Sequence, residues 1–247
     1  MSIVCVQEFL DARLSYMCSA KTDTNVNRKL ADIVIDEAIK HVIFDGWSDQ
    51  TLKKVCIELK FSEHKVRQIF PRGGVDMALA FHQRDDERFF QKFIASNSSQ
   101  PNQRIRDRIE SAINGRLEIA FENKEAVKRS VSLLATPLYL SEGTRALWGT
   151  SDKIWVSIGD KSDDLNWYSK RLILLSVFSA ALVFWIEDDS LDFSETRDFV
   201  KRRIRNVMEI ESFKGKIRKS DSWQSFVNKF KVSALDIIKR KEHFPGL

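Results

Sequence analysis

The chain has 247 residues, of which 43% are hydrophobic and 30% are charged, which is the composition of an ordinary globular protein. It contains only 4 Pro and 9 Gly residues, which argues against long loops. The net charge of +5 is unevenly spread, because residues 214–247 carry +6 and the rest of the chain is close to neutral. An anionic partner is therefore expected to meet the tail. Three cysteines without a CxxC pair and the absence of a secretory signal predict a cytosolic protein with free thiols.

The periodic pattern begins after a leader of residues 1–26. Apolar residues recur every three or four positions from Leu30 to Ile43, and Ser48 and Ser62 are suitable N-caps for two further short helices, the last of which Pro71 stops. Three helices in this spacing predict a helix-turn-helix unit over residues 27–73. Its charge is only slightly positive, which does not favour DNA binding over a unit kept for packing.

Longer helices are predicted after Gly74, and helical spacing continues to about Met208, with a possible break at Gly143 or Gly149. No apolar alternation of strand type reaches strand length, so the predicted fold class is all-α. Residues 74–213 are expected to form one helical domain. The many Phe and Trp residues on these helices can fill a solid core or enclose an apolar cavity.

The central element is the uncharged run Leu172–Ile186, which is short for a bilayer span. A helix that is apolar on all sides is expected to be buried on all sides. It is predicted to be a core helix, which in addition can contribute to a dimer interface or to the wall of a cavity.

Catalytic motifs are absent from the sequence. It has no H-E-x-x-H zinc motif, no E-x-x-H pair for a di-iron site, no G-x-S-x-G and no phosphate-binding glycine loop, so no cofactor and no metal are predicted. The run Asp85-Asp86-Glu87 could be considered as a metal site, but such a run on a helix is typical of a solvated face.

The tail forms a separate element over residues 214–247. A basic linker precedes a predicted amphipathic helix, Ser222 to Lys241, whose apolar stripe includes Trp223, Phe226, Val227 and Phe230, with Lys229, Lys231, Lys239 and Arg240 between or opposite them. This pattern is typical of a helix that lies in a membrane interface, with packing against the body or in a partner's groove as alternatives.

Two blocks of residues resemble a known family. The layout Thr51…Val55…Phe61-Ser62…Ile69-Phe70 is similar to TetR-type regulators. The denser block runs from Leu147-Trp148 through Asp152-Lys153-Ile154-Trp155 and Asn166-Trp167-Tyr168 to Arg202-Arg203-Ile204, and it resembles the ubiquinone biosynthesis accessory proteins, which bind lipid on a TetR-like fold.

The resemblance implies a homodimeric accessory protein rather than an enzyme. Such a protein holds an isoprenoid, quinone or phospholipid and presents the quinone substrate to the demethoxyubiquinone hydroxylase, a di-iron enzyme. It would act as a bacterial-type, cytoplasmic protein, peripheral on the inner face of an anionic membrane. A TetR-type regulator with an apolar ligand and a helical scaffold without a ligand remain as alternatives.

Site residues follow from this interpretation. Helical phase and size predict cavity walls at Phe90, Phe93, Leu117, Phe121, Leu134, Trp155, Leu174, Phe178 and Leu182. The resemblance implies a partner-facing patch with Trp167 and Tyr168 at its centre, and Ile154, Asp164 and Arg171 are assigned to it as well.

Overall fold

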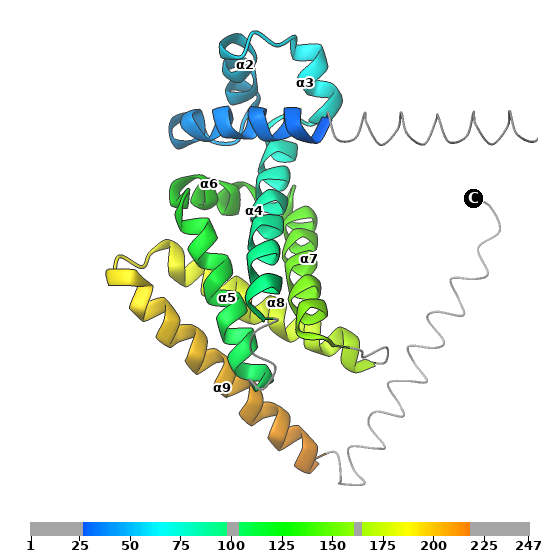
Figure 1. The fold of residues 1–247 in the computed structure, drawn as a ribbon, viewed down its shortest axis with the longest axis vertical. Coiled ribbons are helices and arrows are strands. Elements are labelled where there is room, and N and C mark those ends of the chain that lie inside the picture. The colour runs from blue at the N-terminus through cyan, green and yellow to red at the C-terminus, as the bar shows by residue number, and fades with distance from the viewer. Residues whose placement is uncertain (1–26, 98–103, 161–164, 218–247) are drawn as a thin grey trace, which may run out of the picture.

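The structure, a computed structural model, describes residues 27–97, 104–160 and 165–217 (Figure 1). Within these ranges the chain is helical and contains no strand, which confirms the predicted all-α fold. The predicted leader and most of the predicted tail lie outside the described residues.

The N-terminal unit has the predicted helix-turn-helix layout. It consists of a helix over residues 27–45, α2 (Asp49–Glu58) and α3 (Glu63–Ile69). The Ser48 hydroxyl caps α2 by accepting a hydrogen bond from the Thr51 amide at 3.2 Å. The side chains of Val34, Leu52 and Val66 are fully buried and hold the three helices together.

The long helix α4 (Gly74–Asn97) leads from this unit into the body of the molecule (Figure 1). A Cβ atom at Gly74 would lie 2.3 Å from the Trp47 carbonyl oxygen, so only glycine allows this close approach. The Trp47 indole nitrogen in turn donates a hydrogen bond to the Ala126 carbonyl at 3.0 Å. The N-terminal unit is thereby fixed against the body.

The body contains α5 (Ile105–Phe121), α6 (Lys124–Leu134), α7 (Leu140–Ile158), α8 (Leu165–Ile186), the 3₁₀ turn η1 (Leu191–Phe193) and α9 (Ser194–Ile217). In Figure 1, α9 crosses the lower edge of the body, while α7 lies beside α4. Helix α7 is continuous through Gly143 and Gly149, so the break considered at these glycines does not occur. Gly143 instead permits close packing, because a Cβ atom there would lie 2.8 Å from the Leu134 carbonyl oxygen.

Helix α8 is the central helix, but the prediction that it is buried on all sides is wrong. Leu174, Phe178 and Trp185 point into the core, whereas Leu172 and Val183 on another face are 59% and 61% exposed. Residues Trp167–Ile186 are long and apolar enough to cross a membrane by length and composition alone. Since the core of the body is built on its inner face, α8 has the packing of a core helix with one face left open.

Asp188 fixes the corner between α8 and α9. Its carboxylate accepts hydrogen bonds from the amides of Ser190 (2.8 Å) and Thr196 (2.9 Å) and from the Thr196 hydroxyl (2.5 Å). Burial alone would raise the pKa of this carboxyl, but these bonds lower it to about 2. The corner therefore holds α9 at the angle at which it packs on α5 and α8.

Candidate functional site

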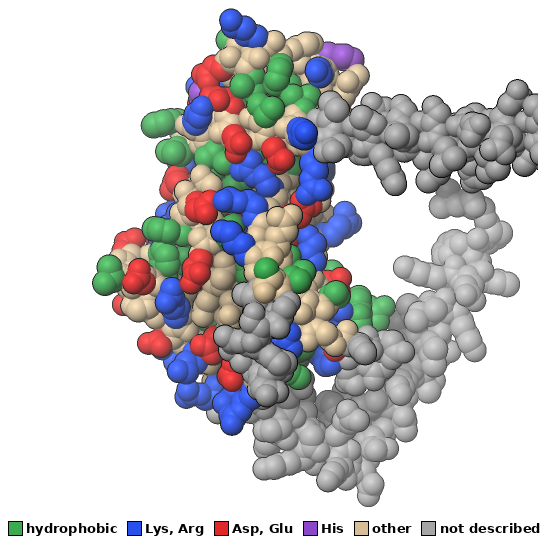
Figure 2. Space-filling model, viewed as in Figure 1, with side chains coloured by type: hydrophobic (Ala, Val, Ile, Leu, Met, Phe, Trp, Pro, Cys, Tyr) green, Lys and Arg blue, Asp and Glu red, His purple; other side chains and the backbone are tan. Residues whose placement is uncertain are grey.

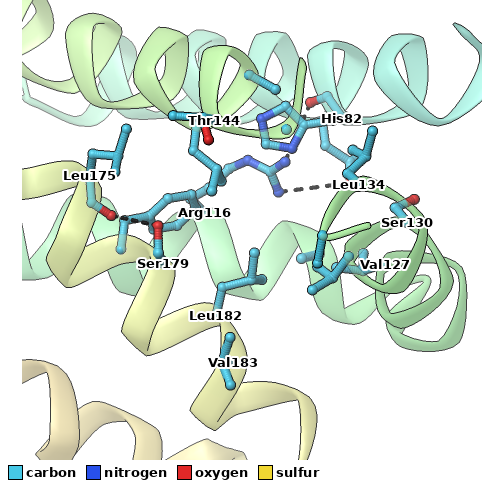
Figure 3. Close-up of a pocket in the computed structure, with 18 of the residues that line it drawn as sticks. His82, Arg116, Val127, Ser130, Leu134, Thr144, Leu175, Ser179, Leu182 and Val183 are labelled. Carbon is cyan, nitrogen blue, oxygen red and sulfur yellow. Dashed lines mark hydrogen bonds and ion pairs between the residues drawn. The ribbon is translucent and has the colours of Figure 1, made fainter. Parts of the chain in front are cut away.

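A cavity of about 270 Å³ lies within the body, among α4, α5, α6, α7 and α8 (Figure 3). Most of its wall is apolar, and this apolar part includes Leu117, Val127, Leu134, Phe178 and Leu182. In Figure 3, Leu182 and Val183 lie across the cavity from His82 and Arg116. Leu140 and Val183 also line the cavity and are exposed, as are Ala135 and Thr144, so the cavity opens to the surface beside these residues. We call it the first cavity.

The first cavity has one polar, buried side. It is formed by His82 and Asp85 from α4 and by Arg116 from α5. The side chains of Asp85 and Arg116 are only 2% and 5% exposed. The cavity therefore combines an apolar wall with a charged end that is shielded from solvent.

Behind this end, Asp86 is fully engaged in an ion-pair and hydrogen-bond network. Its Oδ1 accepts from Arg116 Nε at 2.8 Å and its Oδ2 accepts from the Thr150 hydroxyl at 2.8 Å. His82 Nε2 lies 3.0 Å from the same Thr150 oxygen. Because the Thr150 hydroxyl gives its proton to Asp86, a neutral His82 ring that carries its proton on Nε2 donates to Thr150. Asp86 thus positions both the guanidinium and, through Thr150, the imidazole.

The protonation of this network differs sharply between the two neighbouring aspartates. Burial raises the pKa of Asp85 to about 6, although Arg116, Arg84 and Arg88 oppose the shift. Burial also acts to raise the pKa of Asp86, but His82, Arg116 and the hydrogen bonds from Arg116 and Thr150 outweigh it and lower that pKa. Burial lowers the pKa of His82, which keeps its ring neutral at pH 7.

A second cavity of about 460 Å³ lies between α5, α7, α8 and α9. Its wall is mainly apolar, with the cationic side chains of Arg106 and Lys170 among the lining residues. Trp155 closes one part of it, and its indole nitrogen donates to the Lys170 carbonyl at 3.1 Å.

The predicted wall residues are divided between the two cavities. Four line the first cavity: Leu117, Leu134, Phe178 and Leu182. Two line the second: Trp155 and Leu174. Phe90 and Phe93 are instead buried in the core beside Phe89, and Phe121 is 53% exposed and packs on Phe193, so these three line neither cavity.

The predicted partner patch is partly exposed. Tyr168 is 62% exposed and meets the Trp167 ring edge to face, and the Arg171 guanidinium lies 3.9 Å from the Trp167 ring centre. Arg171 itself is buried and paired with Asp152, and Ile154 is fully buried. These last two side chains cannot make the direct contacts expected of them. Arg171 holds Trp167 in place by donating to its carbonyl at 3.2 Å, and Ile154 belongs to the hydrophobic core.

Other predicted positions lie outside the described residues. These are Asp164 of the partner patch and all eight membrane positions, Trp223, Phe226, Val227, Lys229, Phe230, Lys231, Lys239 and Arg240.

The polar end of the first cavity was missed by the sequence interpretation. The run that starts at Asp85 was expected to be a solvated face, and this is wrong for Asp85 and Asp86, which are buried. A signal was present in the sequence. Asp85 precedes Phe89 by four residues and Asp86 precedes Phe90 by four, so both carboxylates share the face of α4 that these Phe residues bury.

One group of side chains could hold a metal ion by proximity. Glu37, His41 and Glu58 each place a potential ligand atom within 4.8 Å of the others. However, Lys40 donates to Glu37 at 2.7 Å, and His41 already bonds Glu58 at 3.0 Å. This surface cluster is accounted for by its own ion pairs.

The helix-turn-helix unit offers few available cations on α3. Arg67 pairs with Glu63 at 2.8 Å and with Asp49 at 3.3 Å, and Lys65 lies 5.8 Å from the centre of the Phe61 ring. On the face shown in Figure 2, basic, acidic and apolar side chains are interspersed over the upper part of the molecule. This arrangement differs from the basic surface that DNA-binding domains present.

The fold defines a TetR-like helical protein. It is similar to the TetR transcriptional regulator from Nitrosomonas europaea, with a TM-score of 0.58 over 72% of this chain and 97% of that chain. At 17% sequence identity this likeness concerns the fold alone.

The sequence comparisons show which family the chain resembles. Residues 140–211 match the COQ9 family model. The chain is 26% identical over 191 residues to the probable ubiquinone biosynthesis protein coq9, mitochondrial, of Dictyostelium discoideum, covering 76% of this chain and 62% of that protein. It is 24% identical over 195 residues to the human ubiquinone biosynthesis protein COQ9, mitochondrial, covering 75% of this chain and 60% of that protein.

The chain thus spans about three fifths of the length of these relatives. The resemblance to the COQ9 ubiquinone biosynthesis family, drawn from the block that begins at Leu147, is confirmed.

Proposed function

We propose that this protein binds an isoprenoid lipid in the first cavity and presents it to the demethoxyubiquinone hydroxylase, acting as an accessory protein rather than an enzyme. The observation that carries the proposal is the cavity itself, an apolar space with one buried polar end, in a chain related to ubiquinone biosynthesis proteins. A prenylated ring has the same division into a polar head and an apolar tail. A cavity of about 270 Å³ accommodates the head and the start of the tail, and the remainder would leave between Leu140 and Val183.

The geometry supports one orientation of the ligand over the reverse. Asp85 and Arg116 lie in the closed part of the cavity, whereas Val183 at the opening belongs to the exposed face of α8. The head would be held inside and the tail directed outward. A second copy of the chain on the exposed face of α8, and an anionic membrane beneath the tail helix, complete the proposal as further partners.

The first prediction tests whether the cavity holds lipid. Ser179 lines the cavity and its hydroxyl donates only to the Leu175 carbonyl of its own helix, at 2.7 Å. Ser179→Phe would place an aromatic ring in the space that the lipid occupies. A steric cost of about 1.4 kcal/mol or more would weaken lipid binding tenfold or more. Lipid extracted after detergent-free purification and quantified by mass spectrometry should fall accordingly.

The matched control is Ser176→Phe. Ser176 lies three residues away on the exposed side of the same helix, and its hydroxyl bonds the Ile173 carbonyl at 2.7 Å in the same way. This variant should keep its lipid. Absence of isoprenoid from the unaltered protein, or equal loss in both variants, would remove the basis for the proposal.

The second prediction concerns the partner patch. Tyr168→Ala should weaken binding to the hydroxylase by roughly tenfold or more, as expected for an exposed aromatic anchor. Because Tyr168 is 62% exposed, thermal stability and circular dichroism should not change. Leu191→Ala, at another exposed apolar position, serves as control. Equal hydroxylase binding by both variants in surface plasmon resonance would exclude the patch.

A transcriptional regulator with an apolar ligand is the second candidate, favoured by the helix-turn-helix unit and the TetR-like fold. The engagement of Arg67 by two carboxylates argues against it. Selection of bound sequences from random DNA, followed by a gel shift at physiological salt, separates the two functions. A sequence-specific complex would favour the regulator.

A further inference from the structure

Asp85 has an acceptor that the protein leaves unsatisfied. Its side chain is 2% exposed and lines the first cavity, yet its Oδ1 has no hydrogen-bond partner in the described part of the chain. Two guanidinium groups lie near the carboxylate but beyond hydrogen-bonding distance, Arg88 Nη1 at 3.9 Å from Oδ1 and Arg116 Nη1 at 3.8 Å from Oδ2. A buried acceptor without a donor is rare and costly, so it needs an explanation.

The hydroxyl groups in the cavity wall do not supply the missing donor. Each gives its proton to a carbonyl of its own helix: Ser130 to Ala126, Thr144 to Leu140 and Ser179 to Leu175. Arg116 uses Nε for Asp86 and Nη2 for the His82 carbonyl. What remains at this polar end is a buried Asp85 oxygen without a hydrogen-bond donor, beside a cavity whose wall is otherwise mostly apolar.

An acceptor in such a place discriminates between ligands by their donors. A hydroquinone or phenol carries O–H groups, whereas the oxygens of a substituted benzoquinone are all acceptors. A carboxylate that accepts a hydrogen bond from an O–H group in an apolar site forms a strong, charge-assisted interaction. A quinone carbonyl in the same position has no proton to donate, so the carboxylate oxygen and the carbonyl oxygen would both lack a hydrogen bond.

We propose that Asp85 makes the first cavity selective for the hydroxyl-bearing head, so that the protein binds a prenylated phenol or hydroquinone in preference to the corresponding quinone. The Asp85 carboxylate accepts the ligand's O–H, and the tail extends toward Leu140 and Val183. The inference rests on the proposed function, since it requires that the cavity takes a prenylated ring. Beyond the proposed function, the inference specifies that the bound ring is in the phenol or hydroquinone form and that Asp85 selects this form.

The test uses the full chain and three ligands with the same ten-carbon tail: a benzoquinone, its hydroquinone under anaerobic conditions, and a hydrocarbon without oxygen. Binding is measured at pH 8, where Asp85 is ionised, by isothermal titration calorimetry. The hydroquinone is expected to bind at least about tenfold more tightly than the quinone, the effect of one charge-assisted hydrogen bond.

Two variants assign the preference to Asp85. Asp85→Leu should bring the ratio of hydroquinone to quinone affinity close to one while binding the hydrocarbon at least as well, and Asp85→Asn, which keeps the shape of the side chain, should reduce the ratio. Asp198→Asn, at an exposed position on α9, should leave the ratio unchanged. An unchanged ratio in both Asp85 variants would overturn the inference.

The outcomes also separate this inference from the proposed function. If none of the three ligands binds the unaltered protein, the proposed function fails and the inference fails with it. If all three bind equally, or if the quinone binds best through a donor such as Arg116, the cavity takes prenylated rings but Asp85 does not select the hydroxyl form, and only the inference is overturned.

Discussion

Asp85→Asn should raise the free energy of unfolding of the ligand-free protein at pH 8 by about 2 kcal/mol. The pKa of this carboxyl is about 6 in the folded chain against an ordinary value of 3.8, and a difference of that size corresponds to about 3 kcal/mol at most. The folded state therefore binds the proton more tightly than the unfolded state. Asn removes the buried charge without changing the shape of the side chain.

The sign of this effect depends on pH. Above pH 6 the ionised Asp85 lowers stability, and the penalty disappears as the pH falls from 6 through 3.8. The gain from Asp85→Asn should therefore be largest at pH 8 and close to zero at pH 4, as measured by urea unfolding across this range. A loss of stability at pH 8 would show that the ionised carboxylate is satisfied within the fold, which would also weaken the case for a ligand donor.

Asp86→Asn, one residue further along α4, should have the opposite effect and lower the free energy of unfolding by about 3–5 kcal/mol. The change removes the charged partner of Arg116, whose side chain is 5% exposed and whose Nε–Oδ1 contact is 2.8 Å. A buried guanidinium is then left without its carboxylate. Because the pKa of Asp86 is lowered in the fold, its contribution is present above the ordinary carboxyl pKa and is lost as the pH falls below it.

A double variant separates loss of the pair from loss of packing. Asp86→Asn combined with Arg116→Met removes both members of this pair and should be less destabilising than the sum of the two single variants, because neither partner is left buried without the other. Additive effects in urea unfolding would indicate that the pair makes no coupled contribution.

These two neighbouring aspartates differ in how far the fold satisfies their carboxylates. Asp86 is paired on both of its oxygens, as expected of a group that stabilises the fold. Asp85 has no hydrogen-bond partner at Oδ1 in the described part of the chain, and burial raises its pKa to about 6. Groups that cost stability in the free protein and lie in a cavity are typical of binding sites.

Much of the fold could be predicted from the sequence, because its signals are local. Ser48 as N-cap and the helical phase of Val34 and Leu52 depend on neighbours within a few residues. The burial of α8 was overestimated because composition does not say how many helices surround it. Its face with Leu172 and Val183 remains open since neighbouring helices cover only the other faces.

The site was predictable only in part. Size and helical phase predict that Leu117 and Phe178 lie in an apolar wall. Whether a predicted residue lines a cavity, as Leu134 does, or is buried in the solid core, as Phe93 is, depends on the packing of helices that are distant in sequence. The polar end of the cavity also depends on a contact between distant parts of the sequence, since Arg116 and Asp86 are 30 residues apart. The prediction from charge alone was that Asp86 lies on the surface.

The most direct test of the central claim is to locate the ligand by photo-crosslinking. A prenylated hydroquinone with a photoreactive group on the ring would be irradiated with the full chain, and modified peptides identified by mass spectrometry. The account predicts labels around the polar end of the first cavity, on the segments that hold His82, Asp85 and Arg116, and their loss in Ser179→Phe but not in Ser176→Phe. Labels at Trp155 and Leu174 in the second cavity, or labelling that Ser179→Phe does not reduce, would contradict it.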